Sequence, residues 1–317
     1  MSNKILVIDA DPGIGDAVAI AVALADPRLD VVGLTAVGGC VSGLQAGRNL
    51  QALVDALDPP KRPRMGTSES SACRPPDDAA WPLALLNGPH GLGEWEPGTA
   101  DLHHQRDSAK LLSELSRAYP HELLVLTLGP LTNIELTVER DPGFLDRLLG
   151  LYCLGGAIEV PGDVTPVAEY NIYANPASAR AVLRSPASKT LVPLDVSRKT
   201  TLTFELLDRL TENADHPTGR ALRSLLSYAL RSHHQHGGLE SLWLPELTAL
   251  AAITQPQLFQ RSSLAVDVEV DGHVTRGMTV FDRRARPAWR PNLEVVSDVE
   301  SQGLLDYFAA IVRQSAG

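Results

Sequence analysis

Three carboxylates, Asp9, Asp11 and Asp16, follow an apolar run near the start of the chain. Residues 5–8 are apolar at every position, which predicts a strand buried on both faces, and ligands of such sheets bind beyond the carboxyl ends of the strands. The Pro-Gly pair at 12–13 predicts a turn that brings Asp16 back towards Asp11. Crowded carboxylates repel one another unless a proton or a hard cation such as Ca²⁺ or Mg²⁺ lies among them. The stretch therefore predicts an acidic active site; the alternative is an acidic loop in which Asp16 only favours the first turn of a helix.

The composition limits the classes of protein to which the chain could belong. Its 317 residues are 44% hydrophobic, enough for one large α/β core, and the net charge of −10 argues against nucleic acid or an anionic membrane as a partner. The three cysteines, Cys40, Cys73 and Cys153, predict neither a disulfide framework nor a zinc site. No leader segment and no apolar run of about 18 residues is evident. We expect a cytoplasmic protein that acts on a small molecule.

The order of predicted elements defines a fold class. After the first strand and helix, strands are predicted at 29–37, 123–128, 148–154 and 190–194, and helices at 42–57, 108–119 and 176–184. This alternation predicts an α/β fold with an open, mostly parallel, doubly wound sheet flanked by helices, in one domain that spans residues 1–317. Further predicted features are surface loops over the site at 61–101, a helical excursion at 204–232, a hairpin of strands 264–270 and 275–281, and a last helix at 300–313.

Five short motifs occur in the order found in one known family. They are Asp9-Ala10-Asp11-Pro12-Gly13 with Asp16, Leu128-Gly129-Pro130-Leu131-Thr132-Asn133, Gly155-Gly156-Ala157, Thr165-Pro166-Val167-Ala168-Glu169-Tyr170-Asn171 and Thr275-Arg276-Gly277-Met278-Thr279. By these motifs the sequence resembles the inosine-uridine-preferring nucleoside hydrolases, which are calcium-dependent enzymes that cleave the N-glycosidic bond of ribonucleosides. The resemblance implies the nucleoside hydrolase fold and hydrolysis of an N-riboside to the free base and ribose.

The resemblance also implies a set of calcium ligands. Asp11, Asp16, the backbone carbonyl of Leu128 and a carboxylate near the start of a late helix would bind Ca²⁺. In this sequence the last position holds Glu246, where the family has an aspartate. Glutamate keeps the carboxylate and adds a methylene group. The alternative for Glu246 is a carboxylate that only favours the first helical turn.

The implied reaction is direct hydrolysis by a calcium-bound water. Asp11 would be the general base, and Asn171 and Glu169 would hold the ribose, with Asn171 near the ring and Glu169 at the 5′-hydroxyl. The sugar carbon under attack develops positive charge that nearby carboxylates stabilise. The alternative for residues 169–171 is a simple turn.

Four positions depart from the family pattern. Gly15 replaces the first aspartate of a tandem pair, so a carboxylate for the 2′-hydroxyl is missing, and Cys40 replaces an asparagine that contacts the 3′-hydroxyl. Asp163 replaces a further sugar-binding asparagine, and Pro245 replaces a histidine that helps to protonate the departing base. Each lost polar contact costs about 1–3 kcal/mol. We expect Asp163 to restore a carboxylate near the sugar in place of the one lost at Gly15.

A different acid for the leaving base would have to replace the missing histidine. His233, His234 and His236 lie in a Gly-flanked segment before Glu246, and His90 lies in the early loops. Histidine titrates near neutral pH and could protonate a base, so His233 and His234 are candidate catalytic residues and His90 a candidate substrate contact. The alternative is a solvated, histidine-rich loop.

Two other classes of function are weighed against hydrolysis. The first is a nucleoside- or ribose-binding protein of the same fold that has lost turnover, which the four departures favour. The second is a phosphatase of the haloacid dehalogenase type, which also has Asp-x-Asp after a first strand, but the later Gly-Asp-x-x-x-Asp motif of that class is not found. The family resemblance further implies a homodimer or homotetramer.

Overall fold

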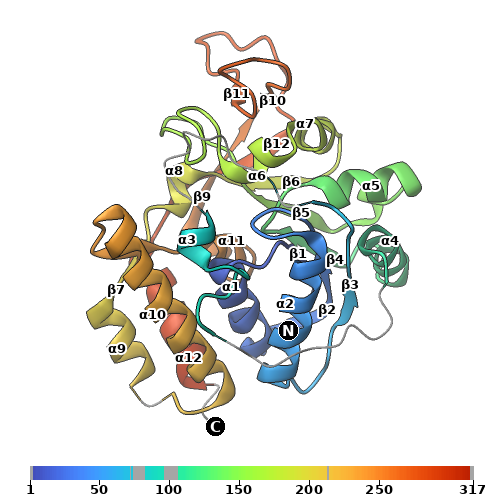
Figure 1. Cartoon of the computed structure of the whole chain (residues 1–317). Coiled ribbons are helices and arrows are strands. Elements are labelled where there is room, and N and C mark those ends of the chain that lie inside the picture. Colours follow the sequence, from blue (N-terminus) through green and yellow to red (C-terminus); the bar gives the residue numbers. More distant parts are fainter. Residues whose placement is uncertain (1–2, 72, 74–82, 96–105, 213, 315–317) are drawn as a thin grey trace.

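An eight-stranded sheet forms the centre of the protein (Figure 1). The computed structural model describes residues 3–71, 73, 83–95, 106–212 and 214–314. Neighbouring strands of the sheet are parallel except β12 and β9, which are antiparallel. In sheet order the strands are β3 (Arg64–Gly66), β2 (Leu29–Ala36), β1 (Lys4–Ala10), β4 (Leu123–Thr127), β5 (Gly150–Leu154), β6 (Lys189–Val192), β12 (Leu293–Val299) and β9 (Phe259–Leu264). The predicted open, mostly parallel sheet is confirmed.

Helices cover both faces of this sheet. The helices of the described residues are α1 (Ile14–Ala25), α2 (Gly43–Leu57), α3 (Leu83–Asn87), α4 (Ser108–Ala118), α5 (Thr132–Arg140), α6 (Tyr170–Ala174), α7 (Pro176–Arg184), α8 (Leu194–Ser197), α9 (Phe204–Thr211), α10 (Pro217–Gly237), α11 (Pro245–Thr254) and α12 (Ser301–Gln314), with 3-10 turns η1 (Leu145–Arg147) and η2 (Pro256–Leu258). Among the described residues, no helix combines the length and apolar character needed to cross a membrane.

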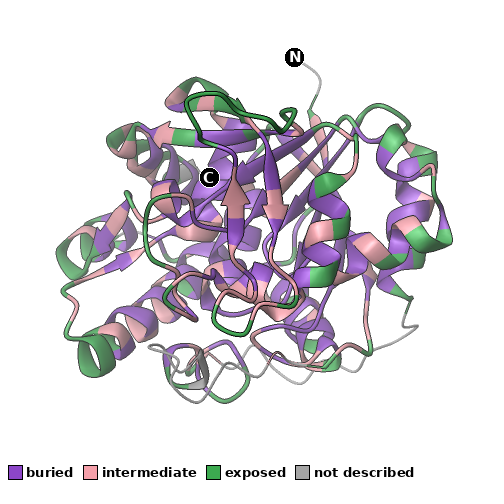
Figure 2. Cartoon of the chain, turned by 90° about the horizontal axis from the view of Figure 1, so that it is seen from above, coloured by how far each residue is buried: buried purple, intermediate pink, exposed green. Residues whose placement is uncertain are grey.

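The apolar run of β1 is explained by two separate core clusters. Leu6 and Ile8 pack in one cluster with α1, α2, α10, α11 and α12, whereas Val7 packs in the other with α4, α5 and α7. Successive side chains of a strand point to opposite faces, so a strand covered on both sides is apolar at each position. Figure 2 shows the central strands almost entirely in the colour of buried residues.

The sheet has a topological switch point beside β1. The chain builds β1, β2 and β3 outwards in one direction and then returns to place β4 on the other side of β1. At such a point the loops that follow the two central strands diverge and leave a crevice at the carboxyl edge. The loops after β1, β2 and β4 border this crevice, and they carry Asp11, Cys40 and Leu128.

Several predicted elements differ from the structure. Residues 61–101 were expected to be loops, but they contain edge strand β3 and helix α3, while 72, 74–82 and 96–101 lie outside the described residues. The predicted hairpin exists with shorter strands, β10 (Val266–Val268) and β11 (Thr279–Phe281), because the Glu269 carboxylate accepts hydrogen bonds from Asp271 and Gly272 and turns the chain early. Strands β9 and β12 were not predicted.

The helical excursion consists of two helices, α9 (Phe204–Thr211) and α10 (Pro217–Gly237). Helix α9 and helix α10 are joined to the rest by a small ribbon of β7 (Thr201–Thr203) and β8 (Ser241–Trp243), and α10 packs against α1 (Figure 1). Helix α10 continues to Gly237, five residues beyond the predicted end at 232. It ends where Gly238 adopts a left-handed conformation with φ 63°, which glycine adopts without steric cost.

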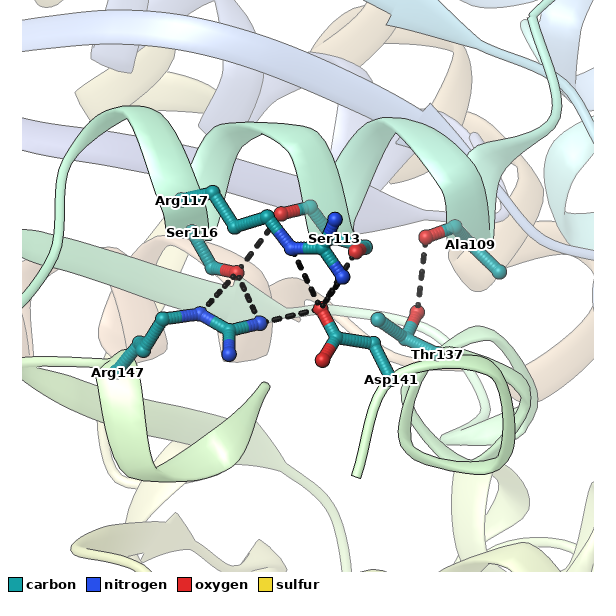
Figure 3. Close-up of polar contacts among 7 residues, drawn as sticks. All are labelled: Ala109, Ser113, Ser116, Arg117, Thr137, Asp141 and Arg147. Atoms are coloured by element: carbon teal, nitrogen blue, oxygen red, sulfur yellow. Dashed lines mark hydrogen bonds and ion pairs between the residues drawn. The ribbon is translucent and has the colours of Figure 1, made fainter. Parts of the chain in front are cut away.

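An ionic network around the buried Asp141 carboxylate links the end of α5 to α4 (Figure 3). Asp141, which ends α5, accepts a hydrogen bond from Ser113 Oγ at 2.6 Å and from Arg117 Nε at 3.2 Å, and it also pairs with Arg147. These partners lower the pKa of the Asp141 carboxyl, with the Ser113 hydrogen bond as the first cause. The first turn of α5 carries Asn133, whose side chain supports the end of β1.

We predict that Asp141→Ala lowers the free energy of unfolding by about 2–3 kcal/mol, because two arginines and a serine lose a charged partner. Urea denaturation followed by circular dichroism measures this loss. Asp146→Asn, at an exposed position of η1, is the matched control and should change little. Equal stability of the two variants would show that the network contributes nothing.

Candidate active site

A polar cavity opens at the carboxyl ends of β1, β2 and β4. Its lining brings together residues that are far apart in the chain and includes eight of the predicted site residues: Asp11, Asp16, Cys40, Leu128, Asp163, Glu169, Asn171 and Glu246. Gly15 and Pro245, two of the positions that depart from the family pattern, line it as well. The structure thus places the predicted metal and sugar residues around one space, and their individual roles stay predictions.

Asp11 is fixed between two glycine loops. Its Oδ2 accepts a hydrogen bond from the backbone N–H of Cys40 at 2.5 Å. A Cβ added to Gly39 would lie 2.6 Å from Asp11 Cγ, and one on Gly129 would also overlap the carboxylate, so no larger residue fits at either place. Burial, and then the negative charges of Glu246 and Asp9, raise the pKa of Asp11 to about 7 against the opposing Cys40 hydrogen bond. A group with this pKa can take up a proton at neutral pH.

Asp9 lies next to the site but does not line the polar cavity, and its side chain bonds instead to Thr35 and Asn133. Its register partner in β2 is Thr35, whose hydroxyl donates to Asp9 Oδ1 at 2.5 Å, and Asn133 Nδ2 donates to the same oxygen at 2.8 Å. Asp9 Oδ2 has no hydrogen-bond partner among the described residues. Burial raises the pKa of Asp9 to about 7. The expectation that all three early carboxylates face one site is therefore wrong for Asp9.

Asp16 serves the helix and the cavity together. Its Oδ2 accepts a hydrogen bond from the backbone N–H of Gly13 at 3.2 Å, as expected for a carboxylate in the first turn of α1. Its pKa is raised well above the ordinary value by burial and by the neighbouring charges of Asp11 and Glu246. Asp16 is therefore a first-turn carboxylate of α1, as the alternative interpretation expected, and it also lines the polar cavity.

Glu246 occupies the space that a side chain at position 15 would fill. A Cβ added to Gly15 would lie 2.6 Å from Glu246 Oε1 and closer still to Oε2. Burial, followed by the charge of Asp163, raises the pKa of Glu246 to about 7. A carboxylate is therefore present beside Gly15 although Gly15 itself has none, and it comes from the first turn of α11.

The oxygen atoms that line the polar cavity are suitable ligands for a hard cation. Asp11, Asp16, Glu246 and the carbonyl of Leu128 offer only oxygen atoms. Burial first, and then neighbouring negative charges, raise the pKa of the three carboxyl groups. However, no group of three or more His, Cys, Asp or Glu side chains in the described part of the chain has an arrangement that could hold a metal ion. The chemistry of the donor set fits such an ion, and its binding stays a prediction.

Glu169 and Asn171 join the ends of neighbouring strands. Glu169 caps α6 and accepts backbone hydrogen bonds from Gly156, Asn171 and Ile172 at 3.0–3.1 Å. Asn171 Nδ2 donates to the carbonyl oxygens that follow β4 and end β5, at 2.6 and 3.2 Å. Burial and the charge of Asp163 raise the pKa of Glu169 to about 8. Both residues hold the turn together while they line the cavity.

The histidines are placed differently from the prediction. His233, His234 and His236 lie in the last turns of α10 and not in a loop, because the helix continues to its glycine cap. His234 is exposed and lies 3.5 Å from Glu240, and His90 and His236 are exposed. None of these three lines the polar cavity or the apolar cavity beside it.

An apolar cavity adjoins the polar one. The two share Gly15, Asp163 and Glu246 in their lining. Apolar side chains from α1, α3, α10 and α11 line part of the second cavity: Ile14, Val18, Leu86, Leu226, Ala229 and Leu247. His233 also faces it, with Nδ1 2.8 Å from the Ala229 carbonyl oxygen, and burial lowers its pKa. The pair of cavities suits a ligand with one hydroxyl-rich half and one flat, less polar half.

Known proteins match the chain over almost its full length. The family model for inosine-uridine preferring nucleoside hydrolases matches residues 6–306. Uridine nucleosidase 1 of Arabidopsis thaliana is 31% identical over 96% of this chain and 92% of its own, and the pyrimidine-specific ribonucleoside hydrolase RihA of Escherichia coli O139:H28 is 29% identical over 96% of both. Among solved structures, a purine-preferring ribonucleoside hydrolase from Gardnerella vaginalis superposes with a TM-score of 0.88 at 26% identity, covering 99% of each chain.

The fold and the site thus define an N-glycosyl hydrolase of the nucleosidase class. The chain belongs to the inosine-uridine preferring nucleoside hydrolase family. At about 30% identity to the relatives named above it is a divergent member.

We predict that Gly15→Ala lowers nucleosidase turnover at least about tenfold with little change in melting temperature. The added methyl group would overlap only the carboxylate end of the Glu246 side chain, so the fold persists while the carboxylate leaves its place. Gly150→Ala in β5, where a Cβ would make ordinary contacts at 3.5 Å, is the matched control. Turnover equal in both variants would mean that the position of Glu246 does not matter.

Proposed function

We propose that this chain hydrolyses the N-glycosidic bond of a ribonucleoside, or a related N-riboside, to the free base and ribose. The observation that carries the proposal is the acidic cavity at the switch point, with the pKa of Asp11 near 7, next to an apolar cavity. The sugar would occupy the acidic cavity and the base the apolar one. The scissile bond would then lie between them, beside Glu246 and Asp163, which face both.

In this account Asp11 is the general base. It removes a proton from the attacking water while that water bonds to the sugar carbon and the bond to the base nitrogen breaks. Positive charge develops on the sugar ring, and the carboxylates of Glu246 and Asp163 lie where they stabilise it. Asp163 Oδ1 is buried without a hydrogen-bond partner among the described residues, which suits a sugar hydroxyl as its partner.

A bound divalent cation, Ca²⁺ in our proposal, would be held by Asp11, Asp16, Glu246 and the Leu128 carbonyl. When bound, such an ion lowers the pKa of a coordinated water and neutralises part of the negative charge of its ligands. Asp11 retains its hydrogen bond to the Cys40 N–H throughout, which orients the carboxylate. Cys40, Glu169 and Asn171 remain proposed sugar contacts from the wall of the cavity.

The named relatives do not agree on which base the substrate carries, since two are named for uridine or pyrimidines and one for purines.

We also propose that the protein is a homodimer or homotetramer and that it is cytoplasmic. The alternative function is nucleoside or ribose binding without turnover. Two observations favour it: Pro245, which cannot donate a proton, lines both cavities, and His234 and His90 line neither.

We predict release of reducing sugar from purine and pyrimidine ribonucleosides in the presence of Ca²⁺ and its loss after chelation. Asp11→Asn should lower the turnover number about 10²- to 10⁴-fold, because the general base is removed. Asp208→Asn, at an exposed position of α9, is the control and should behave as the wild type. Nucleoside binding without sugar release would favour the binding protein instead.

A further inference from the structure

Arg198 presents a cation to the apolar cavity. It caps the C-terminus of α8, the short helix that follows β6, and its side chain is 23% exposed. The guanidinium carbon lies 4.9 Å from the centre of the Trp243 ring, and Nη2 lies 3.8 Å from Asp163 Oδ2. Both partners lie in the wall of the same cavity. Sequence analysis gave no role to Arg198, since an isolated arginine carries no motif.

The donors of Arg198 are unusually little used. Arg28, Arg180 and Arg284 each donate two hydrogen bonds to a carboxylate within 3.2 Å. The Arg198 side chain makes no such bond to the described residues, and its only ion pair is long. A guanidinium has five N–H donors, and a half-buried one that stacks on an aromatic ring is held in place while its edge remains able to bind an acceptor.

The proposed reaction needs a positive group at this location. When the bond between the sugar carbon and the base breaks, its electron pair goes to the base nitrogen, which becomes negatively charged. The oxygen of water forms the new bond to carbon, and Asp11 takes the proton. Pro245 has no proton to give, and burial lowers the pKa of His233, so that its neutral form is favoured.

We propose that Arg198 binds the leaving base and stabilises the negative charge that develops on it. The inference rests on the proposed function and assigns a catalytic residue to it. The base departs as an anion paired with Arg198 and then takes a proton from solvent, while Asp11 returns its proton to solvent, so the net reaction consumes one water. Asp163, besides its proposed contact with the sugar, orients the guanidinium through its Oδ2. Bases with a carbonyl oxygen or a ring nitrogen that can face Arg198 are the substrates this arrangement favours.

The test compares two leaving groups in the metal-loaded full-length enzyme. Arg198→Gln should lower the turnover number about 10²- to 10³-fold on inosine or uridine. On 4-nitrophenyl β-D-riboside the loss should be less than about threefold, because 4-nitrophenolate is a stable anion that needs no such help. Arg198→Lys should recover part of the loss on nucleosides, since it keeps the charge but not the planar donors. Arg28→Gln is the control. It also removes a stacked arginine, whose guanidinium carbon lies 5.1 Å from the centre of the Tyr307 ring, but Arg28 lines neither cavity.

The outcomes separate the two proposals. An equal loss on both substrates would mean that Arg198 only maintains structure, and no loss on either would mean that it has no role; each result overturns the inference while leaving hydrolysis intact. A wild-type enzyme that cleaves neither substrate overturns the proposed function and the inference with it. A loss confined to nucleosides, with an unchanged melting temperature, supports the inference.

Discussion

The crowding of carboxylates at the end of β1 is the constraint on which the rest of the site depends. Asp11 and Asp16 are buried, and Glu246 reaches in from α11. Burial is the first cause that raises the pKa of all three carboxyl groups, and neighbouring negative charges, among them Glu246 for Asp11 and Asp163 for Glu246, raise it further. Such a cluster is stable only if protons or a cation balance it and if fixed donors hold its oxygens. The Cys40 N–H and the absence of side chains at Gly39 and Gly129 meet the second need for Asp11. The same burial and crowding raise the pKa of Asp11 to about 7, so that it can act as a base near neutral pH.

The sheet topology converts this constraint into a binding site. Reversal of strand order at β1 opens a crevice in which loops from three parallel strands meet, and α10 and α11 close its far side with apolar side chains. The result is an acidic half beside an apolar half, joined at Glu246 and Asp163. Arg198, stacked on Trp243, brings positive charge to the apolar half. Opposite charges thus lie on the two sides of the proposed scissile bond, where a glycosidic cleavage separates charge.

Local sequence signals predicted the parts of the structure that depend on local interactions. The buried run of β1, the alternation of strands and helices, and the place of Asp11 and Asp16 at the end of β1 follow from patterns that a few neighbouring residues carry, whereas the place of Asn171 in the site was implied only by the family resemblance. Strands β9 and β12 escaped prediction because β9 is a largely polar edge strand and its pairing partner is distant in sequence. The position of Glu246 over Gly15 and the stacking of Arg198 on Trp243 arise from long-range packing, which no local pattern encodes. The histidines were placed beyond a helical stretch predicted to end at 232, whereas α10 continues to Gly237 and includes them.

Calorimetric titration of the protein with Ca²⁺ at pH 7, in two buffers of different ionisation enthalpy, tests the central claim most directly. If Asp11, Asp16 and Glu246 share the ion, their raised pKa values mean that binding must displace protons, about one or more per ion. The release should shrink at pH 9, where the groups with a pKa of about 7 have already lost their protons, and in Asp11→Asn. Calcium binding without proton release at pH 7, or no binding at all, would contradict the account of an acidic, cation-binding active site.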